Sequence, residues 1–221
     1  MNFYEFFIQC LPKLLKGMGM TLQMTVVSLI LAIVLGMISC FFKISKFKFL
    51  NLLSNIYVNI IRGTPLMVQA FFLYFGLTSA FQFQMGAFQA SVIILSLNAG
   101  AYLSEIFRSG ISAVNKGQME AARSLGLPYH VAMRKVILPQ AIRIVIPSVV
   151  NQFIITLKDT SILSAIGMGE LMKASNLIVA RTFRGFDVYG MAAIMYFILI
   201  MVLTKVSQII ERRLSNGKGK G

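Results

Sequence analysis

Two long runs without a charged residue constrain this chain more than any other feature. Residues 17–42 carry no Asp, Glu, Lys or Arg over 26 positions, and residues 63–104 carry none over 42 positions. About 20 apolar residues are enough to span a bilayer as a helix. The first run is therefore long enough for one spanning helix and the second for two. This pattern predicts an all-α membrane protein.

We expect five transmembrane helices, at about residues 17–42, 64–80, 87–107, 137–157 and 188–210. The fourth is the least certain of the five because it contains Arg143. The segment 47–61 is also apolar, but it ends at an Arg-Gly-Thr-Pro sequence, residues 62–65. Glycine and proline there predict a break before the second span, with the first segment lying at the membrane interface.

The charges of the loops predict the orientation of the chain. The loops after the first, third and fifth spans hold an excess of basic residues, namely Lys43, Lys46, Lys48, Arg108, Lys116, Arg123, Arg134, Lys135, Lys205, Arg212, Arg213, Lys218 and Lys220. Basic residues collect in the cytoplasmic loops of membrane proteins. We therefore expect the N-terminus outside and the C-terminus inside. The same rule accounts for the net charge of +14 without a nucleic-acid partner.

The chain is expected to form one transmembrane domain over residues 1–214, followed by a flexible basic tail at 215–221 that could contact lipid. No internal repeat is visible, which argues against both halves of a transporter lying in one chain. Five spans are also too few to enclose a solute pathway. A second copy, or a close relative, would supply the other wall.

The loop at about residues 109–136 contains the polar stretch EAARSLGLPYH, residues 120–130. Residues 116–125 are strong helix formers, with Met119, Ala122 and Leu125 on one side. Lys116, Glu120 and Arg123 share another side, at spacings that permit ion pairs. Gly126 is suited to the left-handed position after a helix, and the proline two residues later opens a second short helix, residues 129–136. Such a loop is either a plain interhelical connection or the docking site of a soluble partner.

The pattern of this loop resembles that of the membrane subunits of binding-protein-dependent ABC importers. Their loop has E-A-A, three residues, G, nine residues and I-x-L-P; this chain has Glu120-Ala121-Ala122, Gly126 and Val136-Ile137-Leu138-Pro139, with Val in place of Ile. The resemblance covers about residues 15–212 and is closest to the polar amino acid permeases. Further matching segments, in order, are Arg62-Gly63-Thr64-Pro65-Leu66, Ala101-Tyr102, Glu105-Ile106-Phe107-Arg108, Lys158-Asp159-Thr160-Ser161 and Glu170-Leu171.

The resemblance implies a multi-pass subunit of the bacterial cell (cytoplasmic) membrane. Its cytoplasmic loop would be a coupling helix docked in an ABC ATPase, with Glu120, Ala121, Ala122 and Gly126 as the coupling residues. The sequence has no G-x-x-x-x-G-K-[ST] phosphate loop, so ATP and Mg would be used by the partner and no cofactor or metal by this chain. The other implied partners are a second permease subunit, with a homodimer favoured, and an extracytoplasmic amino-acid-binding protein. Transport would proceed by alternating access, without enzyme activity of its own.

Polar residues near the spans are the candidates for contact with the solute, because acids inside membranes are costly and usually functional. The candidate residues are Asn98, Tyr102, Glu105, Asp159, Thr160 and Ser161. Thr160 and Ser161 are expected to open a helix whose N-terminal amides suit a carboxylate. Three acids near a pathway, Glu105, Asp159 and Glu170, favour a cationic amino acid such as arginine, lysine or histidine. The same motifs resemble those of relatives that carry glutamine, so the expected solute is a basic or polar amino acid.

Each candidate also has a structural interpretation that the sequence leaves open. Glu105 could pair with Arg108, and Asp159 with Lys158 or Arg62. Asp159, Thr160 and Ser161 could cap a helix. Glu170 could be structural as well.

The functional alternatives are a permease for another small polar solute, an intramembrane protease and a channel. The segment Gly167-Met168-Gly169-Glu170 bears a faint likeness to the motif of aspartyl intramembrane proteases, but with Glu in place of Asp. A channel would leave the long cytoplasmic loop unexplained.

Overall fold

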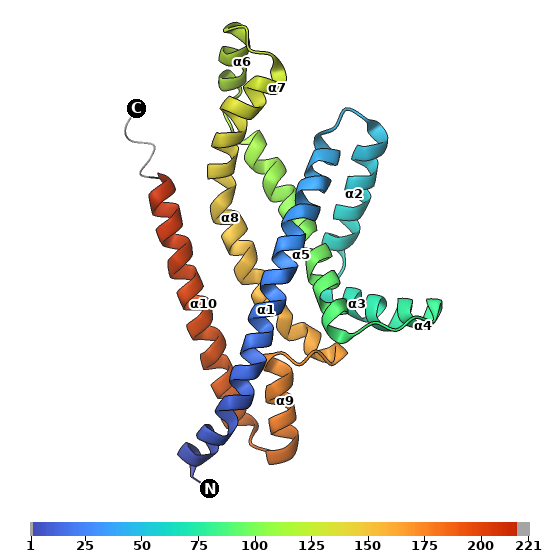
Figure 1. The fold of residues 1–221 in the computed structure, drawn as a ribbon, viewed down its shortest axis with the longest axis vertical. Coiled ribbons are helices and arrows are strands. Elements are labelled where there is room, and N and C mark those ends of the chain that lie inside the picture. Colours follow the sequence, from blue (N-terminus) through green and yellow to red (C-terminus); the bar gives the residue numbers. More distant parts are fainter. Residues whose placement is uncertain (1, 216–221) are drawn as a thin grey trace.

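The computed structural model describes residues 2–215, and every regular element in that part of the chain is helical (Figure 1). The all-α prediction is therefore confirmed. The basic tail predicted beyond this range lies outside the described residues. In chain order the elements are α1 (Phe3–Ile44), α2 (Lys48–Gly63), α3 (Leu66–Phe71), η1 (Phe72–Leu77), α4 (Thr78–Phe81), α5 (Ala87–Ser112), α6 (Lys116–Ser124), α7 (Tyr129–Ala132), η2 (Met133–Ile137), α8 (Leu138–Asp159), η3 (Thr160–Ile166), α9 (Leu171–Thr182) and α10 (Gly185–Ser215).

Four helical stretches among the described residues are long and apolar enough to cross a membrane. They are Tyr4–Ile44, Ala87–Ser112, Tyr129–Ile166 and Gly185–Arg212. The bent pair Lys48–Gly63 and Leu66–Phe81 brings the number to five if it counts as one span. The stretches agree with the expected spans but are longer, since each helix continues past its uncharged part.

The second span differs from its expected form. The helices on either side of the Arg-Gly-Thr-Pro sequence meet at 108°, so residues 64–80 do not form a straight span of their own. Thr64 and Pro65 both have extended backbone angles, because the proline lacks an N–H group and cannot continue the helix. The helix α2 runs beside the end of α1 (Figure 1), and its Ser54 is buried against Ser39 of α1. Helix α2 therefore packs on α1, and its expected placement at the membrane interface stays a prediction.

The helices α1 and α5 form the centre of the bundle, and glycines let them approach closely. A Cβ atom added at Gly36 of α1 would lie 2.8 Å from the Leu103 Cβ of α5. One added at Gly100 of α5 would lie 3.1 Å from the Leu35 Cβ of α1. Small residues at such crossings let backbones pack together in membrane proteins. Nearby, Ala32, Ala99 and Leu103 form a buried cluster.

The two ends of the molecule carry different elements. The N-terminus and α9 lie at one end, whereas α6, α7 and the C-terminal end of α10 lie at the other (Figure 1). At the first end, Phe6, Leu14, Leu171 and Val188 belong to one buried cluster that joins α1, α9 and α10. The opposite placement of the two termini is what an odd number of crossings requires.

Candidate functional site

The loop predicted to contact a partner is a short helix with well-formed ends. At its start, the Asn115 side chain accepts a hydrogen bond from the Gly117 amide at 2.8 Å. At its end, Gly126 has φ +81°. The Leu127 amide donates to the Ala122 carbonyl at 3.2 Å, and the Gly126 amide donates to the Arg123 carbonyl at 3.0 Å. These two bonds form a Schellman motif, so the predicted helix stop is present.

One side of this helix is attached to the bundle. Ala122 is buried, and Met119 packs against a cluster that contains Val114, Ile137 and Ala141. Leu125 was expected on the same side, but it is 82% exposed. It follows the last helical residue and has ψ near 8°, which turns its side chain away.

The expected ion pairs around Glu120 are absent from the structure. The salt bridges of the described residues join other positions: Lys43 with Glu105, Arg108 with Glu105, and Arg184 with Asp187. Both Glu120 and Ala121 are exposed on α6. The helix is thus held by its caps and by Ala122, and the Glu120 carboxylate is available to a partner. The coupling roles of these residues stay predictions.

A cavity of about 380 Å³ with both polar and apolar walls lies between the end of α2, the second half of α5 and the middle of α8. Its polar lining consists of Arg62, Tyr102, Glu105, Ser109 and Ser148. The Arg62 guanidinium stands over the Tyr102 ring, 5.2 Å from its centroid. This places a cation, an aromatic face and hydroxyl groups around one space, which is an arrangement suited to a small polar solute.

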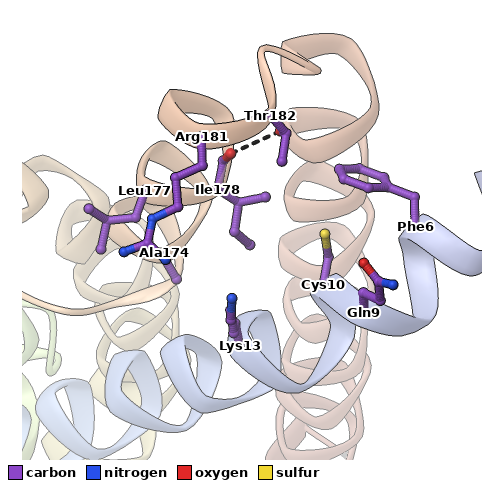
Figure 2. A pocket seen from close by; sticks show the side chains of 9 residues that line it. All are labelled: Phe6, Gln9, Cys10, Lys13, Ala174, Leu177, Ile178, Arg181 and Thr182. Atoms are coloured by element: carbon purple, nitrogen blue, oxygen red, sulfur yellow. Dashed lines mark hydrogen bonds between the residues drawn. The ribbon is translucent and has the colours of Figure 1, made fainter. Parts of the chain in front are cut away.

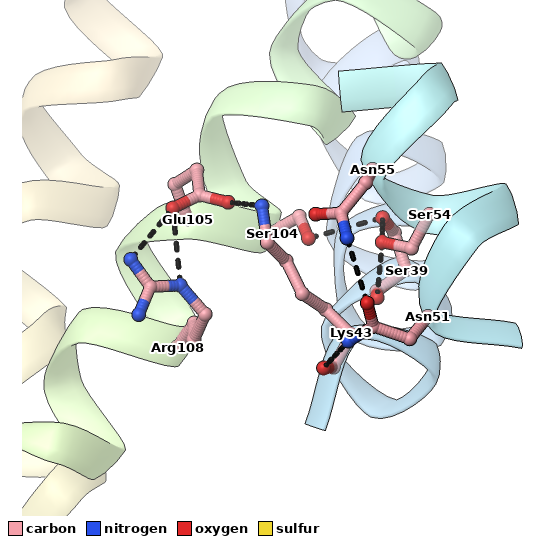
Figure 3. A network of polar contacts seen from close by, with 8 residues as sticks. All are labelled: Ser39, Lys43, Asn51, Ser54, Asn55, Ser104, Glu105 and Arg108. Atoms are coloured by element: carbon pink, nitrogen blue, oxygen red, sulfur yellow. Dashed lines mark hydrogen bonds and ion pairs between the residues drawn. The ribbon is translucent and has the colours of Figure 1, made fainter. Parts of the chain in front are cut away.

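Glu105 lines this cavity, and two basic side chains neutralise the charge of its carboxylate. One carboxylate oxygen accepts from Lys43 Nζ at the end of α1. The other accepts from Arg108 Nε at 3.1 Å and Nη2 at 2.9 Å (Figure 3). The side chain is 17% exposed. The predicted pairing with Arg108 is confirmed, and Lys43 is a second partner that the sequence analysis missed.

The ion pairs continue into a network of hydroxyl and amide groups that joins α1, α2 and α5 (Figure 3). The hydroxyls of Ser39 and Ser54 lie 2.8 Å apart, and the Ser104 hydroxyl lies 3.0 Å from that of Ser39. The Asn51 side chain donates to the Lys43 carbonyl. Hydrogen bonds between helices replace the missing water inside a membrane. The network therefore holds Glu105 in place.

Asn98 has a structural partner at the bend of the second span. Its amide donates to the Gln69 side chain at 3.1 Å. Gln69 in turn donates to the Ile61 carbonyl at 2.7 Å and to the Thr64 carbonyl at 3.0 Å. Both are carbonyls that the broken helix cannot satisfy by itself. Asn98 thus anchors the bend to α5, away from the cavity that Tyr102 and Glu105 line.

The structure does not bring Asp159, Thr160 and Ser161 into the cavity that Tyr102 and Glu105 line. Helix α8 passes into η3 without a break, and the Thr160 amide bonds the carbonyls of Thr156 and Lys158. The Thr160 hydroxyl donates to the Leu157 carbonyl, and that of Ser161 to the Lys158 carbonyl, both at 2.7 Å. The helix N-terminus expected at Thr160 and Ser161 is therefore wrong. None of the three lines the cavity.

Glu170 caps a different helix. It is fully buried, and its carboxylate accepts from the amides of Met172 at 2.8 Å and Lys173 at 2.6 Å at the start of α9. The Tyr196 hydroxyl of α10 donates to the same carboxylate at 3.0 Å. Burial raises the pKa of Glu170, and these three hydrogen bonds act in the opposite direction. The geometry supports the structural interpretation of this acid.

Comparison with known proteins decides the family. Residues 11–217 match the model of a family described as the binding-protein-dependent transport system inner membrane component. The chain belongs to this family. The resemblance seen in the loop motif is thereby confirmed. Its members are permease subunits of ABC transporters, which are not enzymes themselves.

Among relatives of this permease, the arginine transport system permease protein ArtQ of Bacillus subtilis (strain 168) is 38% identical over 206 residues, which cover 93% of this chain and 94% of that protein. The putative glutamine transport system permease protein GlnP of Rickettsia felis (strain ATCC VR-1525 / URRWXCal2) is 37% identical over 214 residues, with 96% and 98% covered.

Two solved structures are similar to the permease in fold. The crystal structure of an amino acid ABC transporter with histidines has a TM-score of 0.92 at 38% identity, covering 96% of this chain and 99% of that chain. An inward-facing structure of the MetNI methionine ABC transporter has a TM-score of 0.74 at 20% identity, covering 91% and 95%. The second shows the same fold only.

Sequence reasoning missed two residues that organise this permease. Gln69 is a polar residue inside a 42-residue uncharged run, four positions after the proline of the break. That position was a usable signal, because buried polar side chains in membranes must find partners. Lys43 had no such signal, since it resembled any basic residue that flanks a span.

Proposed function

We propose that this chain is the permease subunit of an ATP-driven importer of amino acids, of the basic or polar class that includes arginine, lysine, histidine and glutamine. It would work in the bacterial cell membrane as a dimer that alternates between inward-open and outward-open states. ATP and Mg would be used by a separate ATPase subunit docked at α6. An extracytoplasmic binding protein would deliver the solute.

The observation that carries this proposal is the cavity lined by Arg62, Tyr102 and Glu105, in a chain whose relatives carry the names of arginine and glutamine permeases. Its volume of about 380 Å³ lies within the range of about 300–1,000 Å³ that is common for small-molecule sites. Arg62 faces it without a carboxylate partner. A guanidinium is a strong ligand for the carboxylate that every amino acid carries.

The charges around the cavity modify the predicted specificity. Glu105 is neutralised by Lys43 and Arg108, and Glu170 is occupied as a helix cap. Of the three acids that favoured a cationic solute, only Asp159 makes no hydrogen bond or ion pair in the described structure. The support for a basic amino acid therefore comes from the relatives more than from the charges of this site.

The proposed dimer is supported by the unequal burial of the spans. The apolar part of α5 is 67% buried inside the molecule, whereas that of the stretch containing α8 is 28% buried and that of α10 is 17% buried. The faces of α8 and α10 are thus open to a second subunit or to lipid. A homodimer is the simplest assembly, because a symmetric pair of cavities would then face one pathway.

The test is uptake by proteoliposomes that contain this chain, its ATPase and its binding protein. Radiolabelled arginine, lysine, histidine, glutamine and glutamate would be compared, with a small sugar as the control solute. ATP-dependent uptake of one or more amino acids is expected. Uptake of the sugar alone would contradict the substrate class. Uptake without the ATPase would contradict the mechanism, and an obligatory different second permease would contradict the homodimer.

A further inference from the structure

Two basic side chains at the N-terminal end of the bundle face one cavity without an acidic partner. Lys13 of α1 and Arg181 of α9 line a cavity of about 350 Å³. Figure 2 shows both side chains projecting into the space between the two helices. No salt bridge in the described part of the chain involves either residue. Two unneutralised cations around one space attract an anion.

The acids nearby are already engaged. Asp187 accepts a hydrogen bond from Arg184 Nε at 2.7 Å, and the Arg184 guanidinium stands 4.3 Å from the centroid of the Phe6 ring. Glu5, the acid at the start of α1, accepts from the Asn2 amide at 3.2 Å. Among the described residues, no ion pair therefore neutralises Lys13 or Arg181.

Apart from Gln9 and Thr182, the rest of the cavity is apolar. Its walls include Phe6, Cys10, Ala174, Leu177 and Ile178. Figure 2 also shows the hydroxyl of Thr182 bonded to the Ile178 carbonyl, at 2.9 Å, which satisfies one acceptor at the end of α9. Such a cavity suits an amphiphile, whose anionic group would contact the two cations and whose apolar part would contact the apolar walls. A small hydrated anion would use only the cations.

The depth of the cavity in the membrane indicates which kind of amphiphile could bind there. Lys13 lies 29 residues before Phe42, the last residue of the uncharged run. At 1.5 Å per residue this distance along α1 is about 44 Å. A bilayer is about 40–45 Å thick when its headgroup layers are included, with a hydrocarbon core of about 30 Å. When Phe42 lies at one headgroup layer, Lys13 lies at the other.

We propose that this cavity binds an anionic phospholipid. The phosphate lies between Lys13 and Arg181, and apolar parts of the lipid pack against Leu177 and Ile178. On the orientation predicted from the loop charges, the lipid belongs to the outer leaflet. The site would fasten α9 to the start of α1 and make the stability of this end of the permease depend on lipid composition. Lipid binding at this site does not depend on which solute the permease carries.

The test uses the complex of this chain with its ATPase, purified in detergent and titrated with phosphatidylglycerol or phosphatidylcholine. Native mass spectrometry counts the lipids retained. Each basic residue near an anionic membrane surface contributes about fivefold to binding, so the double variant Lys13→Gln with Arg181→Gln should retain phosphatidylglycerol about thirtyfold more weakly. Phosphatidylcholine should be retained weakly by both proteins.

The matched control is Lys16→Gln. Lys16 is an exposed lysine of the same helix that lies one turn away and does not line the cavity. It should leave retention unchanged, as should the charge-preserving pair Lys13→Arg with Arg181→Lys. An equal loss in the Lys16 variant would show a general surface effect and overturn the proposal.

Three further outcomes would also overturn it. The double variant could retain phosphatidylglycerol as strongly as the unaltered chain. Inorganic phosphate could displace the lipid, which would indicate a site for a small anion. The double variant could lose stimulation of ATPase activity by the binding protein while lipid retention stays unchanged, which would assign the cavity to that soluble partner. A double variant that retains less lipid and elutes as an intact complex supports the proposal.

Discussion

Glu105 ties the end of α1 to α5 through one carboxylate. Each of its oxygens accepts from a different cation, and the three side chains are partly shielded from solvent. Loss of this acid would leave the positive charges of Lys43 and Arg108 close together without the carboxylate between them. A hydrogen-bonded charge that loses its partner costs more than the pair contributes in net stability.

We expect Glu105→Gln to lower the stability of the permease by about 1–3 kcal/mol, the cost of unpaired charged groups. Thermal unfolding in detergent would show this as a lower midpoint. The double variant Glu105→Gln with Lys43→Met removes one stranded cation and should recover part of the loss. If Glu105 instead serves only the solute, the single variant would unfold at the unaltered temperature.

Arg62 is the residue most directly tied to transport by the geometry. Its guanidinium faces the cavity over Tyr102, and it forms no salt bridge among the described residues. Arg62→Gln should lower the uptake of any amino acid by about 10- to 100-fold, because a charge-assisted hydrogen bond to the carboxylate is worth about 1.5–3 kcal/mol. Uptake assays in proteoliposomes measure this. Arg143→Gln, at an exposed arginine of α8, is the control and should transport normally.

At the scale of the elements, the crossing of α1 and α5 depends on Gly36. A Cβ at this position would lie 2.8 Å from the Leu103 Cβ and 3.1 Å from the Gly100 carbonyl oxygen. The neighbouring backbone cannot move away as a flexible side chain can. Gly36→Ala should therefore overpack the crossing and destabilise the fold by about 1–3 kcal/mol. The control is Gly19→Ala in the same helix, where an added Cβ meets nothing within 4 Å. Equal unfolding midpoints for the two variants would contradict the close crossing.

The loop helix α6 depends in a similar way on one backbone conformation. Gly126 has φ +81°, and an added Cβ there would meet no atom within 4 Å. Gly126→Ala should therefore act through backbone strain alone, of about 1–2 kcal/mol, and distort the stop that orients α6. We expect ATP hydrolysis by the partner to continue while uptake falls. Gly126→Asn should be milder, because asparagine tolerates the left-handed region. Unaltered transport by the alanine variant would contradict the coupling role.

At the scale of the whole molecule, the orientation in the membrane is a prediction from the loop charges. In a background without the native cysteines, Tyr4→Cys places a thiol at an exposed position near the N-terminus. Lys116→Cys places one at the start of α6. A membrane-impermeant maleimide added to intact cells should label the first variant and not the second. The reverse pattern would contradict the orientation and with it the docking of an ATPase at α6.

Many structural features of this protein can be predicted from local properties of the sequence. The length of an uncharged run determines whether a segment can cross a bilayer, and the spans predicted from such runs have helices at their places. The stop after α6 depends on the backbone of Gly126 and its neighbours, and it was predicted correctly from residue types. The spacing from Glu120 to Pro139 indicated the family, because the residues of this motif lie close together in sequence.

Other features depend on how distant segments turn toward one another, and only the tertiary structure decided them. Glu105 meets Lys43 from 62 positions away, and Asn98 meets Gln69 from 29 positions away. Each pairing depends on the rotation of a helix about its axis, and that of Asn98 with Gln69 depends also on the 108° bend, which no local pattern specifies. The sequence by itself therefore determined the class of protein, most of its spans and the short helix α6 with its stop. The fold determined which polar residues face the cavity, because contact between helices is a property of their packing and not of any one segment.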